Sequence, residues 1–168
     1  IGRWNIPIRH CCTLGELAIY FCATKIPLLQ LQVVACKHWK RNGDVFENAE
    51  WFFPTSPAIQ NIQTALLYPG TGFWEGVNVQ EGRGTAFPFS QMGAPWIDEK
   101  YVRHLNELDI GGVAINPTKF TAVTGRYAGK NCNGIFLQVT DASIFKPIAA
   151  GIALLQVLIQ LYPENIML

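Results

Sequence analysis

The stretch that decides the fold class is Asp98–Phe120, DEKYVRHLNELDIGGVAINPTKF. Asp98 is a residue type that caps helices, and apolar side chains follow it at helical spacing until Gly111-Gly112 ends the pattern. The next residues, Val113–Phe120, predict a strand. A helix that leads directly into a strand is the unit from which α/β folds are built.

The same alternation continues on both sides of this stretch. Thr13 and Glu16 have the spacing of a capping box at a helix start, and Pro147 fits the first turn of a helix. Lys37–Pro57 is irregular and predicts a long loop. The further expected elements are helices over Leu14–Ala23, Ile59–Leu67 and Pro147–Tyr162, and strands over Leu31–Ala35 and Ile135–Thr140. The fold class we predict is therefore α/β.

Composition excludes some partners. The chain of 168 residues has 13 basic and 12 acidic residues, a net charge of +1 and no basic patch, so nothing indicates a nucleic-acid partner. The Pro147–Tyr162 helix is apolar almost all round, but its length of roughly 22 Å is too short to span a bilayer. We expect no membrane span. The chain begins at Ile1 without a signal peptide, and we expect it to be cut from a longer protein.

The cysteines do not form a recognisable site. Five are present, with no CxxC pair and no metal spacing. Their odd number argues against a complete disulfide framework, although one bridge stays possible. We expect small buried side chains or inert thiols, no metal site and no cofactor.

The most polar stretch of the chain is the loop Glu75–Thr85. It places two carboxylates, an amide and a guanidinium on a backbone rich in glycine. Glycine permits unusual dihedral angles or close approach by another molecule, and polar groups near a buried site need partners. The loop therefore predicts a ligand-contacting segment.

Several phrases in register resemble one family. They are Ile6-Pro7-Ile8-Arg9-His10, Thr13-Leu14-Gly15-Glu16, Pro54-Thr55-Ser56-Pro57, Tyr68-Pro69-Gly70-Thr71, Glu75-Gly76, Glu81-Gly82-Arg83-Gly84-Thr85, Gly93-Ala94-Pro95-Trp96-Ile97-Asp98, Tyr127-Ala128-Gly129, Cys132-Asn133-Gly134 and Phe145-Lys146-Pro147. In this order they look like the bacterial exo-β-N-acetylmuramidases, the NamZ-like peptidoglycan hydrolases. The resemblance covers nearly the whole chain.

The resemblance implies a glycosidase that removes terminal N-acetylmuramic acid from peptidoglycan fragments. It also implies the end of a Rossmann-like domain over residues 1–70 and part of a smaller α/β C-terminal domain over residues 71–168. The N-terminal half of the usual protein, with a Pro-Glu-His-Gly segment whose glutamate is the favoured catalytic residue, would be missing. Family members are usually secreted or associated with the cell envelope. After His10 the family usually has Gly-Met, where this chain has Cys11-Cys12, and Val77 and Gln80 replace common Thr and Ser.

Glu75 and Glu81 are the candidate catalytic carboxylates. Glycosidases use two carboxyl groups about 5–5.5 Å or about 6.5–9.5 Å apart. Six extended residues would separate Glu75 from Glu81 by about 20 Å, so only a loop that folds back, for example at Gly76 or Gly82, brings them together. Our preferred interpretation is that Glu81 works with a carboxylate outside this chain. The structural alternative is that both glutamates shape the loop.

The candidate substrate-binding residues are Arg83, Asn78 and His10. Arg83 either orders the loop through a salt bridge or binds the lactyl carboxylate of N-acetylmuramic acid, a role that suits its fork of donors. Asn78 either binds a sugar group or caps a turn. His10 follows an extended run just before a helix start, where open α/β sheets place ligands. A lone histidine is also often structural.

Aromatic residues could stack on sugar rings or serve as core anchors. The candidates are Trp39, Trp51, Phe52 and Trp74.

Two further function classes stay open. A non-catalytic protein that binds muramyl sugars would use the same loop without the second carboxylate. A nucleotide-binding α/β domain is disfavoured, because Glu81-Gly82-Arg83-Gly84 lacks the three-glycine pattern between a strand and a helix. The upstream reading frame would distinguish the enzyme from the binding protein.

Overall fold

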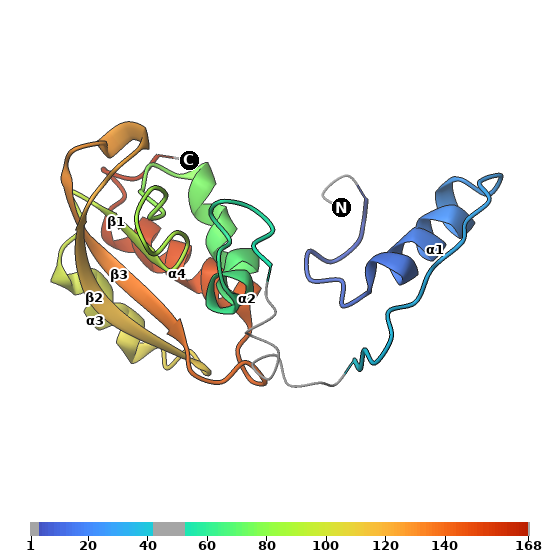
Figure 1. Ribbon diagram of the computed structural model, residues 1–168. Helices are drawn as coiled ribbons and strands as arrows, with labels where there is room; N and C mark the ends of the chain where they lie inside the picture. Colours follow the sequence, from blue (N-terminus) through green and yellow to red (C-terminus); the bar gives the residue numbers. More distant parts are fainter. Residues whose placement is uncertain (1–3, 42–52, 168) are drawn as a thin grey trace. The chain divides into compact units, whose positions relative to one another are not determined.

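The computed structural model describes residues 4–41 and 53–167. The chain divides into two compact units, Ile1–Asp44 and Val45–Leu168, and each is described by itself (Figure 1). The domain boundary that we predict after residue 70 falls within the second unit and stays a prediction. Most of the loop predicted over Lys37–Pro57 lies outside the described residues.

The first unit contains the helix α1 (Leu14–Lys25). Its start is a capping box: the Glu16 amide donates to Thr13 Oγ1 at 3.2 Å, and the Thr13 amide donates to Glu16 Oε2 at 2.8 Å. The Arg41 guanidinium also donates to Glu16, and this hydrogen bond is the main reason that the pKa of Glu16 is lowered. The predicted helix and its cap are confirmed.

The predicted strand over Leu31–Ala35 is wrong. These residues have no regular secondary structure, and Val34 is 86% exposed. A strand needs a neighbour for its backbone groups, and the described part of the first unit contains no other strand. The run before His10 is likewise not a strand but a series of bends. A Rossmann-like character for this part of the chain stays a prediction.

The second unit is mixed α/β, as the sequence predicts. In chain order its elements are α2 (Ile62–Thr71), the 3-10 helix η2 (Gly72–Gly76), β1 (Gln91–Ala94), α3 (Glu99–Glu107), β2 (Val113–Thr121), the 3-10 helix η3 (Gly125–Tyr127), β3 (Asn131–Val139) and α4 (Pro147–Leu161).

The strands form an antiparallel sheet in the order β1-β3-β2. In the middle, β3 pairs along its whole length with β2, from Val113 opposite Val139 to Thr121 opposite Asn131. Pro117 lies in β2, which is an edge strand, where a residue without an amide hydrogen is tolerated. The predicted strand over Ile135–Thr140 is thus confirmed but begins four residues earlier, because the hairpin with β2 extends it.

Sequence patterns did not reveal β1. It has only four residues and no alternation of apolar and polar side chains. Its Gly93 is required by close approach to β3, because a Cβ there would lie 2.5 Å from the Asn133 carbonyl oxygen. Pairing with β3, rather than local propensity, makes this segment a strand.

The core lies between the sheet and the helices. The longest helix, α4, packs against α2 and α3 (Figure 1). Tyr101 of α3 is fully buried, and its hydroxyl donates to the Leu154 carbonyl oxygen of α4 at 2.9 Å. At the crossing of α2 and α4, Gly70 faces Gly151, and a Cβ on either would strike the backbone of the other helix.

The helix boundaries follow from local capping. Asn61 accepts a hydrogen bond from the Thr64 amide at 2.9 Å, so α2 begins at Ile62 rather than at the expected Ile59. Asp98 caps α3 as predicted. Among the described residues no helix is long and apolar enough to cross a membrane.

Candidate functional site

A pocket of about 510 Å³ gathers the polar residues of the Glu75–Thr85 loop. It lies entirely within the second unit. Its lining comes from three parts of the chain, namely residues 75–83, the turn Thr124–Arg126 and Met167. Four of the five site residues predicted from sequence line it: Glu75, Asn78, Glu81 and Arg83.

The loop reaches this shape through pairing with the sheet. The Gln80 amide donates to the Gly93 carbonyl oxygen at 2.8 Å, and the Gly93 amide returns a bond of 2.9 Å to Gln80. Gly82 then turns the chain with φ of +78°, where a Cβ would lie 2.7 Å from the Phe87 carbonyl oxygen. The carboxylates therefore sit on a backbone that β1 holds in place.

Both candidate carboxylates contact Arg83. Its Nη2 donates to Glu75, and its Nε lies 3.5 Å from Glu81 Oε1. The guanidinium also lies over the Phe89 ring, 5.2 Å from its centroid. The extended geometry with about 20 Å between the glutamates is thus not adopted. A turn at Val77 and Asn78 lies between the two glutamates.

The two glutamates differ in burial. The Glu81 side chain is 11% exposed, whereas the side chain of Glu75, which lies in η2, is 37% exposed. No hydrogen bond from a described backbone amide to either carboxylate is present, and both carboxylates contact Arg83 instead.

Asn78 is engaged with the chain itself. Its Nδ2 donates to the Asn165 carbonyl oxygen at 2.8 Å, and its Oδ1 accepts from the Met167 amide at 2.7 Å. The backbone N–H of Asn78 also donates to the Met167 carbonyl oxygen at 3.2 Å. A contact with sugar stays a prediction, for which Asn78 has one free Nδ2 hydrogen.

His10 belongs to the first unit and is described separately from the pocket. Its Nδ1 accepts a hydrogen bond from the Cys12 amide at 3.1 Å. Between them, Cys11 has φ of +55°, a left-handed conformation that favours glycine. The sequence departure at Cys11 therefore falls on a position where glycine is the natural choice. A substrate contact for His10 stays a prediction.

Sequence reasoning missed part of the lining. Thr124, Gly125 and Arg126 are some forty residues from the loop, and only the β2–β3 hairpin brings them to it. The Thr124 hydroxyl donates to the Arg83 carbonyl oxygen at 3.5 Å. Gln80 belongs to the loop, but from the sequence it stands out only as a glutamine where the family commonly has a serine, whose hydroxyl is lost. A single sequence contains no signal of such long-range pairing.

The two aromatic candidates that the structure describes do not line this pocket. Trp74 is fully buried and belongs to the core, while Trp39 is 54% exposed and lies beside the Arg41 guanidinium in the first unit. Trp51 and Phe52 lie outside the described residues. Cys132 is buried and Cys11, Cys12 and Cys36 are exposed free thiols, so that their inertness stays a prediction.

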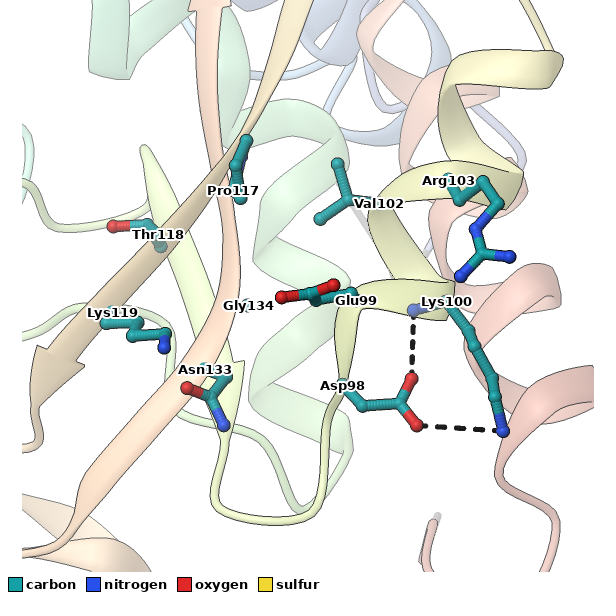
Figure 2. Close-up of a pocket in the computed structure, with 10 residues that line it drawn as sticks. All are labelled: Asp98, Glu99, Lys100, Val102, Arg103, Pro117, Thr118, Lys119, Asn133 and Gly134. Atoms are coloured by element: carbon teal, nitrogen blue, oxygen red, sulfur yellow. Dashed lines mark hydrogen bonds and ion pairs between the residues drawn. The ribbon is translucent and has the colours of Figure 1, made fainter.

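A larger hollow of about 780 Å³ lies elsewhere, between α3 and the strands β2 and β3 (Figure 2). Its rim is made of exposed charged side chains, among them Lys100, Arg103 and Lys119. Asp98 caps α3 there and accepts a hydrogen bond of 2.8 Å from the Tyr162 hydroxyl, which is the main cause of its lowered pKa. These contacts account for Asp98 as a structural residue. We place the candidate site in the smaller pocket, where Gln80 and Glu81 are buried.

Metal chemistry has no support in the geometry. Within residues 4–41 and 53–167, no group of three histidine, cysteine or acidic side chains is arranged to hold an ion.

Comparisons with known proteins agree with the resemblance seen in the sequence. Residues 66–168 match the family model described as exo-β-N-acetylmuramidase NamZ, C-terminal, and residues 1–63 match the corresponding N-terminal model. Peptidoglycan β-N-acetylmuramidase NamZ of Bacillus subtilis (strain 168) is 36% identical over 166 residues, which is 98% of this chain. The chain spans only 40% of the length of that relative.

A solved structure supports the same relationship. The crystal structure of a DUF1343 family protein from Bacteroides fragilis NCTC 9343 superposes with a TM-score of 0.80 and 26% identity. The match covers 89% of this chain and 40% of that one. On the strength of the two family models, this chain belongs to the exo-β-N-acetylmuramidase NamZ family.

Proposed function

We propose that this chain is part of a glycosidase that releases terminal N-acetylmuramic acid from peptidoglycan fragments. The observation that carries the proposal is that Glu75, Asn78, Glu81 and Arg83 line one pocket in a member of this family. A volume of about 510 Å³ falls in the range of small-ligand sites, about 300–1,000 Å³.

In this proposal the pocket is one wall of the sugar cleft. Arg83 contacts both glutamates, so a guanidinium rather than a sugar ring occupies the space beside the two carboxylates. Glycoside hydrolysis needs an acid and a second carboxylate on opposite sides of the scissile bond. Glu81, the more buried of the two, therefore works with a carboxylate outside this chain, and Glu75 holds Arg83 in place.

Arg83 then serves substrate binding. A guanidinium has five N–H donors, and the contacts with Glu75 and Glu81 leave donors for a carboxylate of the sugar. His10, in the first unit, is a further substrate-binding residue of the longer protein. Because peptidoglycan lies outside the cytoplasm, the protein acts as a secreted or envelope-associated enzyme.

The test is to complete the reading frame and assay a chromogenic β-glycoside of N-acetylmuramic acid. We expect Glu81→Gln to lower kcat by at least about tenfold, and Arg83→Ala mainly to raise KM. Glu75→Gln should raise KM by loosening Arg83. The chain of 168 residues alone should show little turnover. Unchanged kinetics in both Glu81→Gln and Arg83→Ala would refute this placement of the site.

The arrangement of the ion pair also favours a second function, a non-catalytic protein that binds muramyl sugars. Both carboxylates share one guanidinium, which is a suitable arrangement for binding without chemistry. Binding of N-acetylmuramic acid by the completed protein without hydrolysis of the glycoside would support this alternative.

A further inference from the structure

The side-chain amide of Gln80 lines the pocket without a hydrogen-bond partner among the described residues. Gln80 is only 4% exposed, and its backbone is fixed by the pair of hydrogen bonds with Gly93. Among the described residues, the side-chain polar atoms that are closed off from solvent without a partner are Thr71 Oγ1 and Trp74 Nε1, and the amide atoms of Gln80 are not among them. The Gln80 amide is therefore open to the pocket, where a ligand can reach it.

Two other glutamines of this unit, one buried and one half-buried, show the contrast. Gln91 is also 4% exposed, and its Nε2 donates to Thr85 Oγ1 at 2.8 Å. Gln63 uses both ends of its amide, since Nε2 donates to the Val139 carbonyl oxygen at 3.1 Å and Oε1 accepts from the Val139 amide at 3.0 Å. Neither Gln91 nor Gln63 lines the pocket. An unpartnered amide is thus particular to Gln80 among these three.

Arg126 follows a glycine that lies against this amide. The preceding residue, Gly125, has φ of +75°, and a Cβ there would lie 3.0 Å from Gln80 Oε1. Arg126 is exposed and lines the same pocket, where its Nη1 lies 3.7 Å from Met167 Sδ, a weak acceptor. Within the described residues no carboxylate forms an ion pair with Arg126, whereas Arg83 has two.

We propose that Gln80 and Arg126 together recognise an acidic N-acetylated amino sugar, Gln80 by its acetamido group and Arg126 by its carboxylate. This inference rests on the proposed function, and it names the residues that set substrate specificity. It also gives the sugar a cationic partner in addition to Arg83, whose donors are partly used by Glu75 and Glu81.

The chemistry of the two groups supports this assignment. An acetamido group carries one N–H donor and one carbonyl acceptor, and the Gln80 amide offers the complementary acceptor and donor. A guanidinium binds a carboxylate through two parallel charge-assisted hydrogen bonds. N-acetylmuramic acid has both substituents, N-acetylglucosamine has only the acetamido group, and muramic acid has only the carboxylate.

The test measures the binding of these sugars to the 168-residue chain by isothermal titration calorimetry. The unmodified chain should bind N-acetylmuramic acid at least about tenfold more tightly than either of the other sugars. Arg126→Gln should reduce that advantage over N-acetylglucosamine several-fold and leave the affinity for N-acetylglucosamine unchanged. Gln80→Met should weaken both acetylated sugars and leave muramic acid unchanged.

Matched controls separate recognition from folding. Gln91→Met replaces an equally buried glutamine outside the pocket, and Arg103→Gln replaces an exposed arginine on α3. Both should leave every affinity within about twofold. The proposal is overturned if Arg126→Gln weakens N-acetylglucosamine as much as N-acetylmuramic acid, if both pocket variants bind like the unmodified chain, or if the folded chain binds none of the sugars.

The two proposals can fail separately. If the completed protein hydrolyses the chromogenic glycoside while the pocket variants keep the sugar preferences of the unmodified chain, recognition by Gln80 and Arg126 is wrong and the glycosidase stands. If the predicted preferences are found but the completed protein does not hydrolyse the glycoside, the recognition stands and the glycosidase is wrong.

Discussion

Replacement of the glycines at the crossing of α2 and α4 should destabilise the second unit by a predictable amount. A Cβ on Gly70 would lie 1.9 Å from the Pro147 carbonyl oxygen, and one on Gly151 would lie 2.4 Å from the Gly70 carbonyl oxygen. Ordinary contacts between carbon and oxygen are about 3.3–3.6 Å, so the helices would have to separate by about 1 Å or more. The obstructing atoms belong to backbone and cannot rotate away.

The expected magnitude follows from two opposing effects. Overpacking of this kind costs about 1–3 kcal/mol and occasionally more, while alanine gains up to about 1 kcal/mol over glycine within a helix. Gly70→Ala has the closer contact and lies in the last turn of α2, so we expect a loss of about 3 kcal/mol. Gly151→Ala, in the middle of α4, should lose about 1–2 kcal/mol.

The assay is native-state hydrogen exchange of the β3 amides. These belong to the central strand of the second unit, so their slowest exchange reports the unfolding of that unit alone. A loss of 3 kcal/mol, the size expected for Gly70→Ala, speeds exchange by about 100-fold or more. Gly76→Ala is the matched control, since a Cβ there would meet nothing within 4 Å. Equal exchange rates in Gly70→Ala and Gly76→Ala would refute the steric argument.

Four further outcomes are expected. Tyr101→Phe removes the hydrogen bond to Leu154 and should lower the free energy of unfolding by about 1 kcal/mol, measured by urea denaturation. Burial raises the pKa of Tyr162 to about 12, above its value of about 10 in an unfolded chain. The stability that Tyr162 contributes is therefore present below pH 10 and is lost as the pH rises toward 12. The urea midpoint of unfolding should fall over that range, and it should fall less in Tyr162→Phe. Asn78→Ala should speed hydrogen exchange at residue 167, whose amide it binds, and unchanged exchange there would show that Asn78 does not hold this segment. Cys11→Gly relieves the strain of a positive φ and should slow hydrogen exchange of the backbone amide of residue 12 by up to about tenfold. The control Cys12→Ser leaves that φ in place and should not slow this exchange.

Local signals were enough to predict the helices and the two strands β2 and β3, though not their pairing. The Thr13–Glu16 capping box, the Asp98 cap and the proline at the start of α4 each act within one turn of a helix, and each is confirmed. The strand expected at Leu31–Ala35 failed because an apolar run is a strand only where a partner pairs with it. The strand β1 was missed for the converse reason, since its partner β3 rather than its own sequence defines it.

The site was predictable only in part. The density of polar groups in Glu75–Thr85 correctly predicted one side of the pocket. It did not predict the turn at Val77 and Asn78, or the contact of both glutamates with Arg83. Arg126 could not be connected with the loop from one sequence, because a hairpin some forty residues away positions it. Gln80 was visible in the sequence, and only its place in the pocket lining, without a hydrogen-bond partner among the described residues, reveals its importance.

The distribution of the pocket lining along the chain has a consequence for folding. Residues 75–83, 124–126 and 167 meet only after β1 and β2 have paired with β3, so the pocket depends on contacts between distant parts of the chain. Such contacts form slowly because long loops must close first. During synthesis the pocket cannot exist before β3 has left the ribosome. When the sheet unfolds on heating, sugar binding should vanish with it.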